Sequence, residues 1–400
     1  PGLREDLREA LILPDMPPTA ELPKEVSSST AATSRTLRGI LGEVMVGQEC
    51  GLARLVDSPG HLKAKLRGLW RPNRPLVILL TGPSGTGKTR LAYAIAEALH
   101  RRPAAELEAT KRLRVFHMNQ LNILEDQKTF FGPPRGATGG GRGDLPELLK
   151  QSPDAVVVLD EIEKAHPSFA QGLLTVFGEN GAVYDISTGR SINASGATYI
   201  LTSNLGKDLI ASRAKVLAAS ASSELPSNSD TQRSSGGDED DAQVSPCAGF
   251  ERLRVDVMDA LTEPHIDQRP NFFRESEVRG RLTDVIPFLP FTPEEVEAAV
   301  RKFLSEEARE IAGDPRFQGA TLAWEPAVVP AFAAVYHRRP EEGLRGVRNR
   351  VTAAVQESLG NALEEDLLRP HCGVLLRLEA GGRIDVRVVV RVAPARPREV

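Results

Sequence analysis

A short apolar segment, a glycine-rich turn and a helical pattern follow one another near residue 80 and constrain this 400-residue chain more than any other feature. The apolar segment covers 76–80, and the turn at 82–87 leads into Lys88, Thr89 and a helical pattern that ends near His100. Glycines let backbone N–H groups converge on an anion, and the positive end of a helix dipole adds attraction. The sequence therefore predicts a buried strand, a phosphate-binding loop and a helix.

The loop has the pattern G-x-x-x-x-G-K-T, in which each polar residue has a separate chemical role. We expect Lys88 to reach the β- and γ-phosphates, and the hydroxyl of Thr89 to ligate Mg²⁺. The predicted nucleotide-binding residues are Gly82, Pro83, Ser84, Gly85, Thr86, Gly87, Lys88, Thr89 and, from a later strand, Asp160. A chance glycine-rich turn is the alternative, but the strand-turn-helix context favours a site for a nucleoside triphosphate.

Two further apolar segments end in polar side chains that suit the same site. Residues 156–159 are followed by Asp160 and Glu161, and residues 198–202 are followed by Ser203 and Asn204. At the carboxyl end of a strand beside a phosphate loop, Asp160 is expected to hold Mg²⁺ with Thr89. Glu161 is expected to polarise the attacking water, and Asn204 to orient it from the other side. A simple acidic strand end and a turn-forming asparagine are the alternatives.

Strand patterns alternate with helix patterns through residues 37–290. This alternation predicts an α/β fold with a parallel sheet between two layers of helices. Residues 1–36 are rich in Pro, Ser and Thr and are expected to be a linker or a disordered arm. Residues 211–249 are dominated by Ser, Ala and Gly and are expected to be an insertion that is disordered at least through its centre.

A second, smaller unit is expected over residues 291–395. Its first helix has a clear start signal, because Thr292 suits the N-cap, Pro293 suits the first helical position, and Glu295 suits the capping box. Helix patterns follow, and then two strand patterns at the end. The prediction is a small α+β domain.

Composition restricts the setting in which the chain works. The net charge of −4 argues against a general nucleic-acid binder, and the apolar runs are too short to cross a membrane. Cys50, Cys247 and Cys372 lack metal-ligand spacing and suit a reducing compartment. The chain begins at Pro1, so a targeting segment would be missing, and the expectation is an intracellular protein of the cytoplasm or the mitochondrion.

Taken together, the motifs resemble the AAA+ ATPases of the Clp family. The resemblance runs from about residue 37 to 391 and is most specific at 160–167, where the sequence reads Asp-Glu-Ile-Glu-Lys-Ala-His-Pro. It is strongest to the second ATPase module of ClpB-type disaggregases, and residues 273–291 are similar to the single-module mitochondrial branch. The resemblance implies an AAA+ P-loop fold followed by a small lid domain, ATP and Mg²⁺ as cofactors, a hexameric ring, and unfolded or aggregated proteins as substrates.

The same resemblance implies two arginine roles. The segment Gly-Arg-Leu-Thr-Asp makes Arg281 the arginine finger, and Gly-Leu-Arg-Gly makes Arg345 the residue that contacts the γ-phosphate from the lid. A fixed arginine stabilises the charge that spreads over the transferred phosphoryl group, and its planar fork matches phosphate geometry. A finger supplied in trans requires a ring of subunits. Ordinary surface or salt-bridging arginines are the alternative.

The chain departs from the family at the pore loop, where Ala137 stands in place of the usual aromatic residue. Alanine offers neither the packing area nor the rigid face with which an aromatic grips a polypeptide. Threading is therefore expected to be weak, unless Tyr184 in a second loop takes over or the chain remodels a specific partner complex. Tyr184 as an ordinary turn residue is the alternative. Phe130 and Phe131 are expected to pack in the core.

Two other functions use the same ATPase core. The first is a motor that acts on nucleic acid, which the two arginines of the glycine-rich pore loop favour only faintly. The second is a scaffold that switches with nucleotide but does not hydrolyse it. Because the residues expected for hydrolysis are all present, the leading hypothesis is an ATP-dependent protein-remodelling or unfolding chaperone.

Overall fold

The structure is a computed structural model with side chains. It describes residues 37–57, 59–132, 142–185, 189–223, 247–263, 265–266, 269–315, 321–364, 373–378 and 384–389. Several expectations lie outside these residues: the arm at 1–36, the pore loop around Ala137, the centre of the 211–249 segment, and Cys372.

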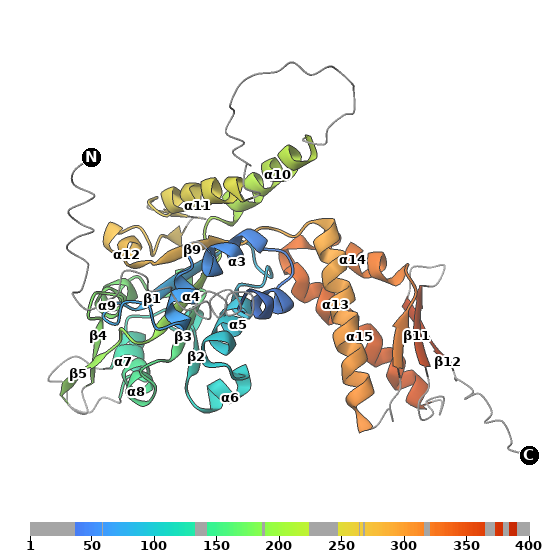
Figure 1. The fold of residues 1–400 in the computed structure, drawn as a ribbon, viewed down its shortest axis with the longest axis horizontal. Coiled ribbons are helices and arrows are strands. Elements are labelled where there is room, and N and C mark those ends of the chain that lie inside the picture. The colour runs from blue at the N-terminus through green and yellow to red at the C-terminus, as the bar shows by residue number, and fades with distance from the viewer. Residues whose placement is uncertain are drawn as a thin grey trace, which may run out of the picture.

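A five-stranded parallel sheet forms the centre of the first unit (Figure 1). Its strands, in chain order, are β1 (Leu76–Thr81), β2 (Leu113–His117), β3 (Val156–Asp160), β6 (Thr198–Ser203) and β9 (Asp284–Pro287). In space they are ordered β2-β3-β6-β1-β9, and every neighbouring pair is parallel. The carboxyl ends of β1, β3 and β6 therefore meet at one edge, and the predicted parallel sheet is confirmed.

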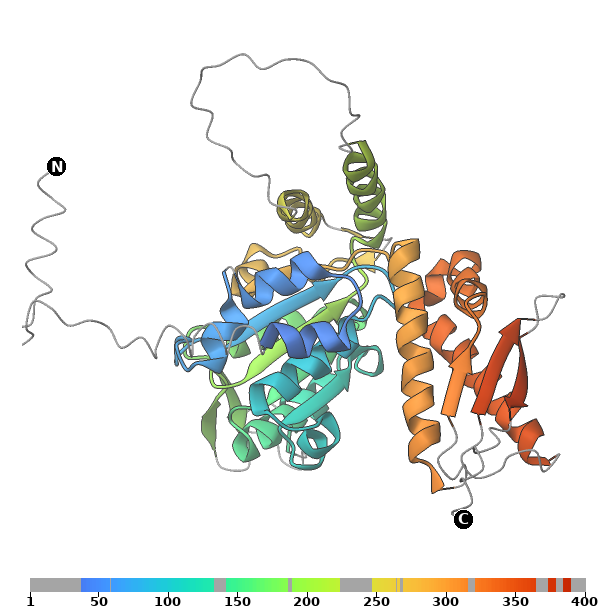
Figure 2. The same cartoon turned by 45° about the vertical axis from the view of Figure 1, so that its right-hand side comes forward.

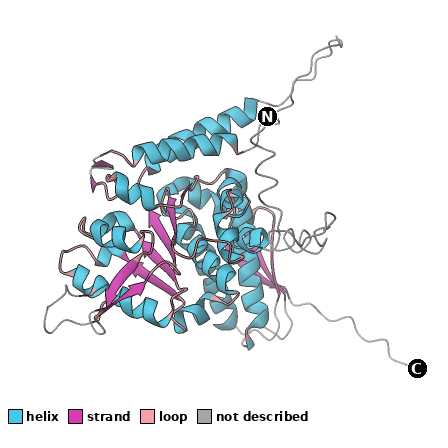
Figure 3. Ribbon diagram, turned by 60° about the vertical axis from the view of Figure 1, so that its left-hand side comes forward, coloured by secondary structure: helices cyan, strands magenta, loops and turns pink. Residues whose placement is uncertain are grey.

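Alternate side chains of the central strands enter two separate cores. In β1, Val77 and Leu79 belong to one core, whereas Leu76, Ile78 and Leu80 belong to the other. All six residues of this strand are buried, as expected for a parallel strand with helices on both faces. Figure 3 shows the helices on either side of the magenta sheet. We call this α/β part the sheet unit.

Helices precede and connect the strands of the sheet unit. They are α3 (Glu49–Val56), α4 (His61–Leu66), α5 (Lys88–His100), α6 (Ala104–Ala109), α7 (Asp126–Phe131), α8 (Asp144–Gln151), α9 (Phe169–Val176), α10 (Lys207–Ser223), α11 (Ala248–Ala260) and α12 (Ser276–Arg281). Residues 37–44 are also helical. Phe130 is buried and its ring contacts that of Phe131, so the expected core role of this pair is confirmed.

A smaller α+β unit follows, which we call the C-terminal unit. It contains α13 (Pro293–Gly313), β10 (Thr321–Trp324), α14 (Val328–Arg338), α15 (Gly343–Glu364), β11 (Gly373–Leu378) and β12 (Ile384–Val389). These elements share their own apolar core. The predicted capping box is present, because the Thr292 side chain accepts from the N–H of Glu295, whose carboxylate accepts from the N–H of Thr292. Figure 2 shows α13 on the side that faces the sheet unit.

Part of the segment 211–249, which was expected to be an insertion disordered at least through its centre, is helical. Helix α10 runs through residues 211–223, and α11 begins at Ala248. The two helices lie side by side above the sheet unit (Figure 1), and Arg213 forms a salt bridge with Asp256 at 2.9 Å. Composition alone missed this helix because Ser and Ala are common in loops, while Ala is also the best helix former.

Cys50 and Cys247 form a disulfide across a sequence separation of 197 residues. It joins α3 to the residue that precedes α11. The same two helices are linked by Arg54, which donates to Glu251 on α11 and to Asp284 on β9. The expectation of scattered cysteines typical of a reducing compartment is therefore wrong for this pair, because spacing along the chain says nothing about distance in the fold.

Among the described residues, four strand pairings were not expected from the sequence, one of them that of β7 (His265–Ile266) with β8 (Arg269–Pro270). β9 lies in the segment that was interpreted only as the arginine-finger region, and β10 pairs with β11 in the C-terminal unit. The hairpin of β4 (Ala182–Asp185) and β5 (Arg190–Asn193) contains Tyr184. Tyr184 is thus a half-buried strand residue paired with Ser191, not a residue of an exposed turn.

Candidate functional site

The phosphate loop joins β1 to α5, as predicted. Gly82 and Gly85 both have positive φ angles, of 146° and 73°. A Cβ atom on Gly82 would lie 2.5 Å from the carbonyl oxygen of Phe288, and one on Gly85 would lie 2.6 Å from the Cα of Gly343. A side chain at Gly82 would therefore collide with the backbone that follows β9, and one at Gly85 would collide with the backbone of the C-terminal unit. Only glycine fits at these two positions.

Lys88 begins α5 with its side chain folded back over the loop. Its Nζ donates to the carbonyl oxygens of Gly82 and Pro83, at 2.8 and 2.7 Å, and to Oδ1 of Asn204 at 3.1 Å. Burial lowers the pKa of Lys88 to about 8, against the opposing pull of Glu163, Asp160 and Glu161. A buried ammonium with only neutral acceptors in contact is well placed for an anionic ligand.

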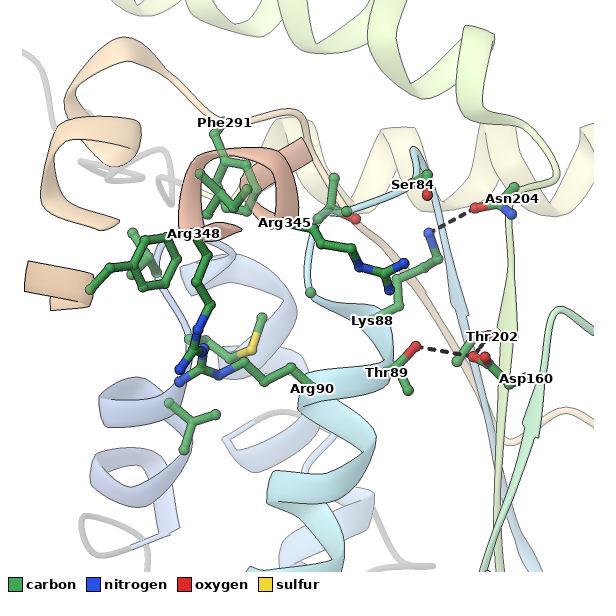
Figure 4. A pocket seen from close by; sticks show the side chains of 18 of the residues that line it. Ser84, Lys88, Thr89, Arg90, Asp160, Thr202, Asn204, Phe291, Arg345 and Arg348 are labelled. Carbon is green, nitrogen blue, oxygen red and sulfur yellow. Dashed lines mark hydrogen bonds between the residues drawn. The ribbon is translucent and has the colours of Figure 1, made fainter. Parts of the chain in front are cut away.

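Asp160 ends β3 beside the start of α5. Its Oδ1 accepts from the hydroxyl of Thr89 at 3.0 Å and from the hydroxyl of Thr202 at 2.7 Å (Figure 4). On the other carboxylate oxygen, Nδ1 of His117 lies at 3.4 Å. The structure thus brings the two predicted metal ligands together. Thr202 and His117 were missed; each stands at the carboxyl end of a strand that neighbours β3, which is a signal that the sequence offered.

Glu161 has a left-handed backbone, with φ of 57°. Non-glycine residues adopt this conformation uncommonly. Its N–H donates to the hydroxyl of Thr202 at 3.0 Å, and its carboxylate accepts from Nζ of Lys164 at 2.7 Å. Thr202 therefore connects both acidic residues: it accepts from the backbone of one and donates to the side chain of the other.

Asn204 follows β6 and faces Lys88. Oε1 of Glu163, in the short helix η2 (Ile162–Lys164), accepts from both the backbone N–H and Nδ2 of Asn204, each at 3.1 Å. These two bonds orient the amide so that its oxygen points at the lysine. Glu163 was not singled out from the sequence, although it lies in the 160–167 segment.

The C-terminal unit closes one side of the site. The loop and strand ends line a cavity of about 300 Å³ together with side chains from α13 and α15. Arg345 lies in this cavity and its side chain extends toward Lys88 (Figure 4). The apolar part of the lining comes from Val44, Met45, Val46, Phe291, Phe303 and Leu344. The cavity is thus lined partly by apolar side chains and partly by the glycine-rich loop and its polar neighbours. Its volume is in the range that small-molecule sites have.

Arg281 ends α12 and does not line this cavity. The residue is half-buried, and its side chain forms neither a hydrogen bond nor an ion pair with any residue that the structure describes. The remaining predicted residues therefore meet in one place, and Arg281 lies outside it.

Known proteins resemble the chain over the same regions. Residues 74–246 match a family described as "AAA domain (Cdc48 subfamily)". The mitochondrial disaggregases of Bos taurus and Homo sapiens are each 30% identical over 341 residues, which is 85% of this chain but only 46% and 44% of theirs. The chaperone protein ClpB of Porphyromonas gingivalis is 29% identical, over 83% of this chain and 33% of its own.

Residues 74–246 thus match an AAA domain, and the chain resembles ClpB-type chaperones and disaggregases over most of its own length. It spans less than half the length of these relatives. The fold is also that of the closed-state cryoEM reconstruction of "Hsp104:ATPyS and FITC casein", with a TM-score of 0.62 over 93% of this chain and 54% of the other, at 18% identity. The AAA+ architecture with a C-terminal α+β unit is therefore established.

Among the described helices, none combines the length and the apolar character that a membrane span requires. No cluster of His, Cys, Asp and Glu with the make-up of a separate metal site is found in the described residues either.

Proposed function

We propose that this chain is the ATPase part of a ring-forming machine that remodels or unfolds proteins. One observation carries the proposal: Thr89, Asp160 and Thr202 converge within hydrogen-bond distance at the mouth of the phosphate loop, in a cavity that Arg345 enters from the C-terminal unit. The match of residues 74–246 to an AAA domain supports ATP as the nucleotide, with hydrolysis to ADP and phosphate as the reaction.

The donor set fits a nucleotide and its cation. In this proposal the backbone N–H groups of residues 84–89 hold the phosphates, and Lys88 exchanges its carbonyl partners for phosphate oxygens. The Thr89 hydroxyl and the Asp160 carboxylate are the hard oxygen ligands that Mg²⁺ prefers. Bound Mg²⁺ would neutralise charge on the β- and γ-phosphates.

For hydrolysis we assign Glu161 as the base that accepts a proton from the attacking water. Its carboxylate must first leave Lys164, with which it pairs at 2.7 Å. Asn204 orients the water, and its amide is already fixed by Glu163. Arg345 contacts the γ-phosphate from the same chain.

Arg281 is assigned as the finger that completes a neighbouring site. Its position outside the cavity and its freedom from ion pairs among the described residues support a role in trans. A finger in trans requires head-to-tail contacts that close into a ring, and we propose a hexamer. The proposed division is an arm at 1–36, an ATPase domain at 37–290 and a lid at 291–395; the separate core of the C-terminal unit supports the last boundary.

The substrate class rests on the relatives, which are chaperones and disaggregases by name. We infer unfolded or aggregated proteins as substrates, and a specific partner complex if the chain with Ala137 threads poorly. None of the relatives named above points to the nucleic-acid alternative. For localisation we infer the mitochondrion, because the relatives from Bos taurus and Homo sapiens are mitochondrial and a disulfide is rare in cytosolic proteins.

Replacing Glu161 by Gln tests the proposal, because the variant keeps the shape of the site but loses the base. We expect ATP binding to persist, turnover to be abolished, and an ATP-locked ring to elute as a larger species than the nucleotide-free chain. The wild type, measured with and without an unfolded protein such as casein, is the control. Unchanged turnover in Glu161→Gln would refute the assignment of the base, and a wild type without ATPase activity would refute the proposed function.

A further inference from the structure

A carboxylate on α13 links the two units beside the nucleotide cavity. Glu306 accepts from Nη2 of Arg90 at 3.3 Å through Oε1, and its Oε2 lies 3.1 Å from Nη2 of Arg348. Arg90 is on α5, one residue after Thr89, and Arg348 is on α15, one turn after Arg345. Figure 4 shows the two arginine side chains extending to the same place from these different helices.

The environment of Glu306 is rich in positive charge. Lys302, one turn earlier on α13, donates to the backbone carbonyl of Val44 at 2.9 Å. Burial lowers the pKa of Lys302, and the positive charge of Arg90 lowers it further. Arg90, Lys302 and Arg348 all line the cavity, whereas Glu306 lies behind them with 20% of its side chain exposed. Without this carboxylate, cations from both units would face one another.

Other contacts also join the units at this point, besides the bond from Lys302 to the carbonyl of Val44. The N–H of Leu344 donates to the carbonyl of Gly85 at 3.3 Å, and the backbones of Gly85 and Gly343 are in direct contact. These contacts can form only while the C-terminal unit lies against the phosphate loop. The guanidinium of Arg348 lies 5.4 Å from the ring centroid of Phe303. The ion pair of Glu306 with Arg348 therefore also orders a wall of the cavity.

We propose that Glu306 is a positioning residue that holds the C-terminal unit closed over the nucleotide. It neutralises Arg90 and Arg348, and it thereby keeps Arg345, one turn away on α15, directed into the cavity. Glu306 touches neither the cavity nor the proposed ligand. This inference rests on the proposed ATP site and goes beyond it by naming the interaction that couples closure of the unit to nucleotide binding.

The expected consequence of losing Glu306 is weaker nucleotide binding with a folded protein. Each pair is partly exposed, so neither alone is worth much, but their loss also leaves the arginines unneutralised. We expect the KM and Kd for ATP to rise about five- to tenfold, with a much smaller change in kcat. This factor is near the lower end of the changes in affinity that one site usually causes at another. Because the bridge is ionic and partly exposed, added salt should weaken binding in the wild type more than in the variant.

The test compares Glu306→Gln and Glu306→Ala with the matched control Glu297→Gln. Glu297 lies on the same helix and pairs only with Arg301 one turn away among the described residues, at 2.8 Å, so it does not join the units. Binding of a slowly hydrolysed ATP analogue, steady-state ATPase kinetics and the melting temperature are measured at low and high salt. Arg348→Gln in the Glu306→Gln background removes the cation left without its partner and should restore part of the lost affinity.

The outcomes separate this inference from the proposed function. Weaker binding in both Glu306 variants, with unchanged binding in Glu297→Gln and a partial rescue by Arg348→Gln, supports it. If the wild type binds the analogue and Glu306→Gln binds it equally well, the inference is overturned and the proposed function stands. If Glu306→Ala does not fold, the isosteric Glu306→Gln decides alone. A wild type that does not bind ATP overturns both.

Discussion

The disulfide between Cys50 and Cys247 should contribute measurably to the stability of the sheet unit. It closes a loop across a separation of 197 residues, which contains four of the five strands of the central sheet. A cross-link of this kind restricts the unfolded chain, and the chain-entropy relation gives about 5 kcal/mol for so long a loop. Because unfolded chains retain some structure, we expect the real loss on reduction to be about 3 kcal/mol.

Urea unfolding of the oxidised and the dithiothreitol-reduced protein measures this contribution. With an m-value of about 3 kcal/mol per molar, the transition of the sheet unit should move down by about 1 M. The C-terminal unit lies outside the loop, so its own transition serves as an internal control. Reduction keeps both sulfur atoms in place and is therefore a cleaner change than a Cys50→Ala/Cys247→Ala variant, which also alters packing.

The folded arrangement should survive reduction. Arg54 still connects α3 to Glu251 on α11 at 2.8 Å and to the buried Asp284 at 2.6 Å. ATPase activity at low urea should therefore change little. The reasoning would be refuted if the two forms unfolded at the same urea concentration, or if reduction shifted the C-terminal unit as far as the sheet unit.

Two further predictions concern the site. Thr202→Val removes the acceptor for the N–H of Glu161 and the donor to Asp160, so we expect a loss of about 1–3 kcal/mol in urea unfolding and a marked fall in ATPase rate; a fall in neither would show that the hydroxyl is dispensable. Arg281→Ala should keep analogue binding but lower the ATPase rate by about 10³. Mixing it with Glu161→Gln subunits should restore activity in part, because each variant supplies what its neighbour lacks; failure to complement would argue against a finger in trans.

The parts of the site that lie next to one another in the chain were predictable, because a short sequence pattern identifies each of them. Lys88 and Thr89 follow their loop directly, and Asp160 and Glu161 follow their strand, so a few neighbouring residues carry the whole pattern. The parallel sheet was predictable as well, because alternating strand and helix patterns leave little choice of topology. Only the resemblance to a family, and no physical signal in the residues themselves, singled out Arg281 and Arg345.

Other features depended on which strands and helices become neighbours. Thr202 meets Asp160 only because β3 and β6 pair in parallel with Val156 opposite Thr198. A shift of one residue in that register would turn each side chain to the opposite face of the sheet. The helix at 207–223 was missed because its Ser- and Ala-rich composition is shared by loops and helices.

By itself, the sequence determined a strand, a glycine turn and a helix that form a phosphate loop, and polar residues at the ends of the strands that follow. These are short-range consequences of backbone freedom and apolar periodicity. Only the tertiary structure decided that Glu163 would orient Asn204, that Glu306 would join Arg90 to Arg348, and that two distant cysteines would bond. The physical reason is that these contacts span tens to hundreds of residues, and tertiary packing, within each unit and between the two, brings their partners together.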